Sequence, residues 1–410
     1  MSLWIKLALR NVLRNHRRSA LTVGTILVAT ALITVALSWM EGLFGTMIRD
    51  QTAVGGHIRI VDADFAAREE LMPLYENIAE VGPVLDAVRA VPGVVDAQAR
   101  VTAGAVITAG EEIGEELTLV VGATDSWYRE HLGGPGSLVA GRWSIGEKEV
   151  VLGRKVAERA GAAVGSEILL LGQTQYGSMS PVSAKVTGIV SANALVDQQA
   201  FLSLEEARWL VDLPDGALEV LVYVRSERAS DVAPVLARLR SLPSLAGLDA
   251  TAWYEREPWA SAMTMVGAMK AFIQALIVFI ASLAIFNTMT MAVMERSGEI
   301  GVMRAMGLTR PGTVGLFVVE ALAIGLTGGL TGTALGAAVG AWLEKNGVTL
   351  GAVADKVGGL PMKATVYADV TPGILGTSIL LGLCIAVVGA TLPSLRAASI
   401  QPVTAMHARR

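Results

Sequence analysis

The chain has 410 residues, of which 52% are hydrophobic and 17% are charged, and its mean hydropathy is +0.52. These values exclude an ordinary soluble enzyme, because such proteins do not carry so large an apolar excess. The formal net charge is −4, and the single cysteine, Cys384, excludes an internal disulfide.

The apolar residues are concentrated at residues 19–40, 271–294, 313–342 and 370–395. The third stretch contains only one charged residue, Glu320, and the other three contain none. At about 1.5 Å per residue, each stretch can cross the roughly 30 Å hydrocarbon core of a bilayer as a helix. The sequence therefore predicts an α-helical membrane protein with four transmembrane helices. Cleavage of the first stretch as a signal peptide is the alternative, but its apolar run is unusually long and no small-residue cleavage site follows it.

Cations next to these stretches predict their orientation, because Lys and Arg close to a span resist translocation. Residues 1–18 contain five cations and no acid, and further arginines lie at residues 295–312 and after residue 395. We expect these segments and both termini in the cytoplasm. Residues 41–270 contain 19 Lys and Arg but 31 Asp and Glu, so this large acidic domain is expected outside the cytoplasm.

A weak repeat divides the outer domain. Residues 84–92, VLDAVRAVP, resemble residues 235–243, VLARLRSLP, and each predicted helix lies between two predicted strands. Two such β-α-β units predict an α+β extracytoplasmic domain with a split β-α-β lobe and an inserted β-rich lobe. An accidental match of two helices is the alternative.

The predicted segments follow in chain order. They are a cytoplasmic amphipathic segment (1–18), the first span (19–45), the extracytoplasmic domain (46–265, with 46–124 and 218–265 as the split lobe and 125–217 as the inserted lobe), the second span (266–294), a cytoplasmic helix (295–312), the third span (313–342), a short outer loop (343–369), the fourth span (370–396) and a cytoplasmic tail (397–410).

Motifs for catalysis or nucleotide binding are absent from the sequence. It contains no GxxxxGK[ST] loop, no HExxH, no CxxC and no GxSxG. The histidines His16, His57, His131 and His407 are divided between the two predicted sides of the membrane, so we expect neither a metal site nor a catalytic triad.

The segment MERSGEIGVMRAMGLTR, residues 294–310, places five charged residues between two apolar spans. Ile300, Met303 and Gly307 share one helical stripe, and Val302 and Met306 share a neighbouring one. Arg296 can pair with Glu299 at i, i+3. Gly307 suits a left-handed helix end. A helix lying on lipid headgroups is the alternative, but its mixed charges favour a protein groove as the partner.

The same region closely resembles the segment between the second and third spans of FtsX-like ABC transporter permeases, which include MacB-type and lipoprotein-releasing (type VII) members. The matching residues are Asn287, Glu295, Arg296, Glu299, Ile300, Gly301, Arg304, Ala305 and Gly307, and the likeness continues through Glu320, Gly325, Gly328, Gly329, Gly332, Gly336 and Gly340 to the tail LPSLRAASIQPVTAM. Met406 departs from this pattern, which usually has leucine there. The resemblance implies that residues 295–307 form a coupling helix that docks on a separate ATPase, through Glu295, Arg296, Glu299, Ile300, Met303, Arg304, Met306 and Gly307.

The resemblance also implies a location in the bacterial inner membrane, a set of partners and a mode of action. The chain is expected to be a non-catalytic permease subunit that binds no cofactor, while ATP and Mg²⁺ bind to the partner. The expected partners are two copies of an ABC ATPase, a second copy of the permease or a related permease, membrane lipids, and a periplasmic adaptor or lipoprotein chaperone, with no nucleic acid. ATP hydrolysis would move the outer domain by mechanotransmission to transfer or extract a hydrophobic or lipidated substrate, such as a lipoprotein. The alternative is a signal transducer that activates a cell-wall hydrolase.

Other residues were assigned by physical argument. Gly332, Gly336 and Gly340 recur every four residues and predict close packing of another helix. Glu320 is expected to make a structural hydrogen bond within the bundle, with proton coupling as the alternative. Apolar residues at the outer ends of the first two spans form a candidate substrate cavity, with plain interfacial packing as the alternative. They are Trp39, Met40, Leu43, Phe44, Met47, Met263, Val266 and Met269.

Overall fold

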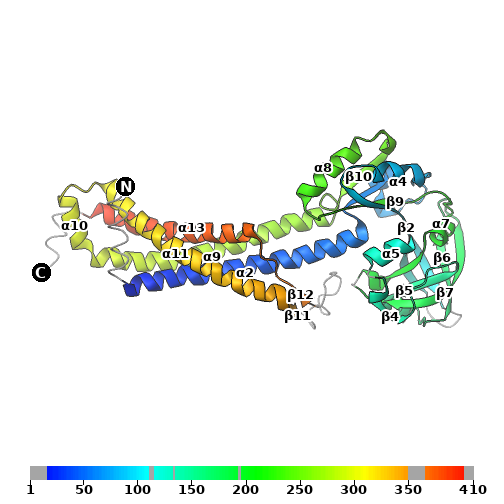
Figure 1. Cartoon of the computed structure of the whole chain (residues 1–410), viewed down its shortest axis with the longest axis horizontal. Coiled ribbons are helices and arrows are strands. Elements are labelled where there is room, and N and C mark those ends of the chain that lie inside the picture. The colour runs from blue at the N-terminus through cyan, green and yellow to red at the C-terminus, as the bar shows by residue number, and fades with distance from the viewer. Residues whose placement is uncertain (1–15, 110–114, 133, 193–194, 350–364, 401–410) are drawn as a thin grey trace. The chain divides into compact units, whose positions relative to one another are not determined.

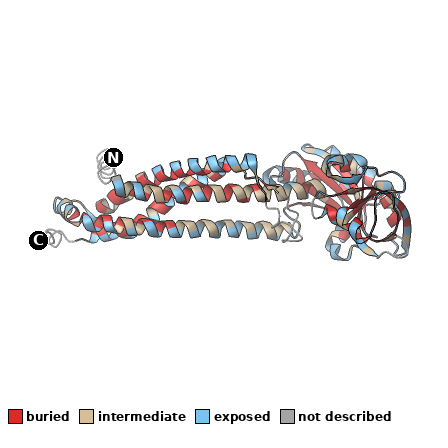
Figure 2. Ribbon diagram, turned by 90° about the horizontal axis from the view of Figure 1, so that it is seen from below, coloured by how far each residue is buried: buried red, intermediate tan, exposed pale blue. Residues whose placement is uncertain are grey.

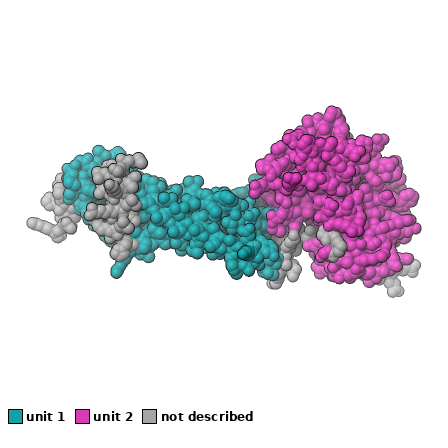
Figure 3. All heavy atoms as spheres, viewed as in Figure 1, with its two compact units in different colours: residues 1–45, 264–349, 365–410 teal, residues 46–263, 350–364 magenta. Residues whose placement is uncertain are grey.

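The computed structural model describes residues 16–109, 115–132, 134–192, 195–349 and 365–400. The chain divides into two compact units (Figure 3). Unit 1 comprises residues 1–45, 264–349 and 365–410, and unit 2 comprises residues 46–263 and 350–364. The predicted N-terminal segment (1–18) and C-terminal tail (397–410) fall largely outside the described residues.

The described part of unit 1 is built from four helices that are long and apolar enough to cross a membrane (Figure 1). They are α2 (His16–Gly55), α9 (Trp259–Glu295), α11 (Arg310–Asn346) and α13 (Pro372–Ser399), with the short α10 (Ser297–Ala305) between α9 and α11. The helices α2 and α9 extend beyond the predicted spans, because each is continuous from unit 1 into unit 2. Four apolar helices were predicted, and this part of the fold class is confirmed.

Local sequence signals mark the N-terminal ends of two of these helices. Thr309 caps α11 by accepting a hydrogen bond from the Gly312 N–H, and Pro311 occupies its first turn. Thr371 and Pro372 start α13 in the same way. A threonine cap satisfies an N–H group that the helix leaves without a partner, and proline has no such N–H group to satisfy.

Close contacts between small residues hold the bundle together. A Cβ atom at Gly325 would lie 2.7 Å from Ala386 Cβ, so α11 and α13 pack closely. A Cβ atom at Gly389, on α13, would lie 2.7 Å from Ile285 Cβ of α9. The buried residues of each helix lie on the sides that make these contacts (Figure 2).

In unit 2, four antiparallel strands form the split β-α-β lobe. The strands are β1 (Ile58–Asp62), β2 (Val94–Thr108), β9 (Glu219–Val224) and β10 (Leu248–Ala252), in the order β10-β1-β9-β2. The helices α4 (Val81–Arg89) and α8 (Ala229–Arg240) follow β1 and β9, and their apolar residues share a core with this sheet. The two units of the sequence repeat therefore pair in one sheet, as predicted.

The inserted lobe continues from the same sheet. It contains β3 (Glu116–Ala123), β4 (Leu138–Gly141), β5 (Glu149–Gly153), β6 (Glu167–Gln173), β7 (Met179–Val190) and β8 (Gln199–Ser203). Its helices are α5 (Asp125–His131), α6 (Arg154–Arg159) and α7 (Leu204–Val211). Short helices α3 (Ala63–Ala67) and η1 (Glu69–Leu71) precede α4, and the strands β11 (Val348–Thr349) and β12 (Thr365–Val366) pair beside α11.

The boundary between the lobes differs from the predicted residue 125. The strand β2 pairs with β9 over residues 94–100 and then with β3 over residues 101–107. Because one long strand belongs to both lobes, β3 already lies in the inserted lobe. Residues 98–103 of β2 include no Gly, Pro, Asn or Asp, so the sequence carries no turn signal at the point where its partner changes.

Candidate functional site

The helix α10 connects the cytoplasmic ends predicted for α9 and α11. Arg296 separates α10 from α9, and at the other end the Leu308 N–H donates to Met303 O at 3.1 Å. Gly307 adopts a φ of +104°, which favours glycine, and its N–H donates to Arg304 O. This short helix with its glycine end has the form that residues 294–310 predict.

The two stripes of α10 face different surroundings. Ile300 is 1% exposed and belongs to the bundle core, and Met303 packs against the same core. Val302 and Met306 are 46% and 75% exposed. Ile300 therefore faces the bundle and is not part of a surface open to a partner, although the sequence assigned it to the docking residues. Glu295, Glu299 and Gly307 are exposed like Val302 and Met306.

Two arginines, Arg296 and Arg304, connect α10 to the rest of the bundle. Arg296 has a side chain that is only 10% exposed, and it lies 3.4 Å from Glu299 Oε2 and 3.6 Å from Glu320 Oε2. Arg304 donates to Ile400 O at the end of α13. A structural hydrogen bond was expected for Glu320, whereas the contact that the structure shows with Arg296 is an ion pair. The sequence did not identify Arg296 as its partner, because 24 residues separate them.

The predicted glycine face packs against α2. A Cβ atom at Gly332 would lie 2.0 Å from Thr30 Oγ1, and one at Gly336 would lie 2.6 Å from Thr34 Cβ. The third glycine, Gly340, approaches Val370 and Ser38. These glycines serve packing within one chain.

The residues of the predicted substrate cavity are divided between the units. Met47 and Met263 belong to unit 2 and the other six to unit 1. Met40 is buried and Met263 packs against the core of unit 2, whereas Met269 is 40% exposed. Trp39, Leu43, Phe44, Met47 and Val266 are half-buried. Sequence analysis missed a charged neighbour of this group, the ion pair between Glu41 and Lys270, whose Nζ and Oε2 atoms lie 2.7 Å apart.

A buried charge cluster in unit 2 was also missed. Glu219, on β9, accepts a hydrogen bond from Arg100 Nε at 2.7 Å and lies 3.4 Å from Arg59 Nε. Although burial opposes its ionisation, the charges of Arg100 and Arg59 lower the pKa of Glu219 to about 2. Burial, reinforced by Arg59, lowers the pKa of nearby Arg256 to about 10. The alternating pattern of each strand indicates which residues are buried, but it does not bring these four charges together.

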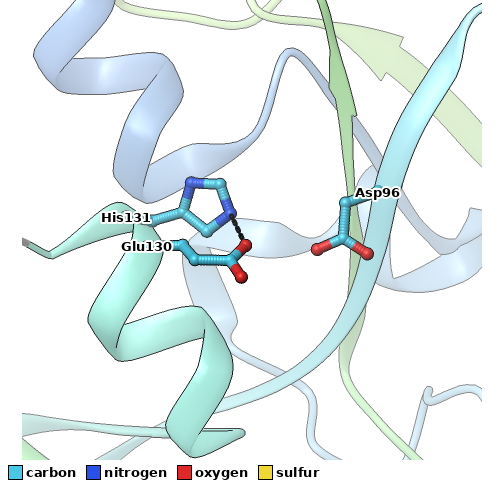
Figure 4. Close-up of side chains that lie close together, drawn as sticks. All are labelled: Asp96, Glu130 and His131. Atoms are coloured by element: carbon cyan, nitrogen blue, oxygen red, sulfur yellow. Dashed lines mark ion pairs between the residues drawn. The ribbon is translucent and has the colours of Figure 1, made fainter.

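One group of side chains has the composition of a cation site. Ligand atoms of Asp96, Glu130 and His131 lie within 4.8 Å of one another (Figure 4). Both Asp96 oxygens already accept hydrogen bonds, from the Ala97 N–H and the Gln98 side chain, and Glu130 is largely exposed. Burial lowers the pKa of His131, whose ring stacks on Tyr223 at 3.8 Å. Because the protein already uses both Asp96 oxygens and Glu130 is largely exposed, the group is not assigned as a metal site.

Comparison with known proteins identifies two families that the chain matches. Residues 19–242, more than half of the chain, match the MacB-like periplasmic core domain, and residues 271–402 match the FtsX-like permease C-terminal family. The pyoverdine export ATP-binding/permease protein PvdT of Pseudomonas entomophila is 23% identical, over 96% of this chain and 57% of that protein. The lipoprotein-releasing system transmembrane protein LolC of Neisseria meningitidis is 26% identical, over 64% of this chain and 65% of that protein.

A solved structure, the periplasmic region of MacB from Actinobacillus actinomycetemcomitans, is 13% identical with a TM-score of 0.35, over 50% of this chain and 94% of that one. The chain spans less than two thirds of the length of the two curated relatives.

The four apolar helices and the mixed α/β domain between the first two, together with the family matches, define an ABC transporter permease, the non-catalytic transmembrane component of such a transporter. The chain belongs to the family of FtsX-like permeases with a MacB-like periplasmic core domain. It is a multi-pass membrane protein, and unit 2 contains its periplasmic or extracellular domain.

Proposed function

We propose that this permease receives the movement of a separate ATPase at α10 and passes it to the extracytoplasmic domain by mechanotransmission. In this proposal both termini are cytoplasmic, and two ATPase copies serve a dimer of permeases. The proposed substrate class is hydrophobic or lipidated, in keeping with the lipoprotein-releasing relative. The residues assigned to the cavity would contact such a substrate.

The observation that carries this proposal is the two-sided character of α10. The stripe that contains Ile300 packs against the bundle, and the buried Arg296 pairs with Glu320. Glu299, Val302 and Met306 remain exposed. A helix bound firmly on one side can transmit a displacement applied to the other. Exposed apolar side chains beside an acid suit a protein groove better than anionic lipid.

The continuity of α2 and α9 supports the second half of the proposal. Each is a single helix with residues in both units. Backbone hydrogen bonds along an uninterrupted helix resist bending, so a shift at one end is passed along its axis.

Acidic substitutions on the exposed stripe test the docking surface. Val302→Glu with Met306→Glu should reduce the amount of ABC ATPase that co-purifies with the permease from its native membrane at least tenfold, because each change places an unpaired carboxylate in the apolar contact. The permease should keep its thermal denaturation midpoint, since both side chains are exposed.

Leu117→Glu is the matched control, because it makes the same change at a residue of unit 2 that is 75% exposed. Undiminished ATPase binding by the double variant would contradict the role of α10. Arg304→Ala is less suitable as a test, since Arg304 also holds the end of α13.

A further inference from the structure

The C-terminal end of α2 lies within unit 2 and requires partners for its last carbonyl groups. A helix leaves its final four C=O groups without internal hydrogen bonds, and its C-terminus carries partial negative charge. The last turn of α2 contains no basic residue. The hydrogen-bond donors for these carbonyl groups therefore come from residues distant in the sequence.

Three side chains from three parts of unit 2 donate to four successive carbonyls, the last of which belongs to the residue after α2. Tyr223 Oη donates to Ala53 O at 3.0 Å, and Arg100 Nη1 donates to Val54 O. Arg256 Nη2 donates to Gly55 O at 3.2 Å and to Gly56 O at 3.3 Å. The sheet residues Tyr223 and Arg100 come from β9 and β2, whereas Arg256 comes from the segment before α9.

The two sheet residues are themselves held in place. Glu219 fixes Arg100, whose guanidinium also lies over the Trp127 ring at 5.7 Å. The same tryptophan donates from Nε1 to Tyr223 Oη at 2.6 Å. Because both sheet residues that cap α2 are oriented by a second contact, displacement of the helix end would break several buried interactions together.

Arg256 adds a direct link between the two helices. It lies three residues before Trp259, the first residue of α9, and its guanidinium contacts the last residue of α2. Gly56, which follows α2, has a φ of +68°, and a Cβ there would lie 3.1 Å from both Ile58 O and Leu221 Cβ. The chain therefore turns tightly from α2 into β1 at the point that Arg256 contacts.

We propose that Arg100 and Arg256 are positioning residues that join the end of α2, the start of α9 and the β10-β1-β9-β2 sheet into one mechanical joint. This inference rests on the proposed mechanotransmission, for which it supplies the contact that delivers helix movement to the extracytoplasmic domain. The joint makes the two helix ends and the sheet move as one body. Loss of either guanidinium lets the end of α2 shift against the sheet while the rest of the domain stays folded.

Distance measurement between spin labels in unit 2 tests the joint. Labels are placed at Arg49→Cys on α2 and Asp231→Cys on α8, two exposed positions, in a Cys384→Ser background. The full-length permease in lipid nanodiscs should give a single narrow distance distribution. Arg256→Gln should at least double its width, and Arg256→Lys should restore most of the native width, because lysine still donates to the carbonyls with a positive charge.

Arg225→Gln is the control, since Arg225 is an exposed arginine at the end of β9. A native distribution for both Arg256→Gln and Arg100→Gln would overturn the joint. If Arg100→Gln fails to fold, Arg256→Gln still decides the result, and unfolding of Arg256→Lys as well would show a merely structural role.

The nucleotide response separates this inference from the proposed function. In complex with the co-purified ATPase, Mg-ATP should leave the native label distance unchanged and should shift or broaden it in Arg256→Gln. Failure to recover any ATPase would count against the proposed function alone, because the widths measured on the permease by itself still test the joint.

Discussion

At the scale of single residues, buried charges mark the places where this chain must hold a fixed geometry. Arg296 pairs with Glu320 within the bundle, and Glu219 pairs with Arg59 and Arg100 in unit 2. Removing one partner from a buried pair typically costs about 3–5 kcal/mol, because the other charge remains without compensation. The stability of the fold therefore depends on both partners of each pair being present.

The pH dependence of stability tests the Glu219 pair. Its pKa of about 2 in the folded state is below the ordinary value of 4.5, so ionised Glu219 contributes stability above pH 4.5 that is lost as the pH falls toward 2. The shift corresponds to about 3 kcal/mol as an order of magnitude. Glu219→Gln should lower the thermal denaturation midpoint of the detergent-solubilised protein at pH 7 by several degrees.

The same comparison near pH 2 should give nearly equal midpoints for Glu219→Gln and the native protein. Glu227→Gln, on the segment after β9, provides a control that removes one carboxylate without disturbing the arginines. A constant difference in midpoint from pH 7 to pH 2 would show that ionisation of Glu219 does not support the fold.

At the scale of whole elements, small residues decide how the helices of unit 1 pack. Gly328, Gly332 and Gly336 approach α2, and Gly325 approaches α13, so α11 contacts two helices through glycine. Without a hydrophobic driving force between helices in lipid, such close contacts supply much of the attraction. Spacing of four residues revealed the face in the sequence, but it did not reveal which helix would cover it.

Alanine substitutions on α11 distinguish packing from helix propensity. A Cβ atom at Gly332 would lie 2.3 Å from the backbone oxygen of Leu27, so Gly332→Ala should destabilise the bundle by about 1–3 kcal/mol. At Gly315, in the same helix, a Cβ atom would have no atom of another described segment within 4 Å, and Gly315→Ala should be neutral or mildly stabilising. Thermal denaturation followed by tryptophan fluorescence compares the two, and equal midpoints would refute the close approach of α2.

At the scale of the whole molecule, the four helices and the domain between the first two set which parts of the chain face each side of the membrane. Cysteine accessibility tests the proposed orientation in a Cys384→Ser background. Trp209→Cys, at a position 74% exposed in unit 2, should react with a membrane-impermeant maleimide in spheroplasts. Ala305→Cys, exposed on α10, should react only in inverted vesicles. Labelling of Ala305→Cys from outside would reverse the proposed position of the termini.

The sequence by itself determined the class of fold, because a run of apolar residues long enough to span a bilayer has few other structures available to it. It also located α10, its glycine end and the two β-α-β units of unit 2, since each of these carries a local periodicity or a turn residue. Only the tertiary structure decided which charges meet. Arg296 with Glu320, and Glu219 with Arg59 and Arg100, are brought together across distant segments, and a local pattern contains no information about a contact that depends on how the elements pack.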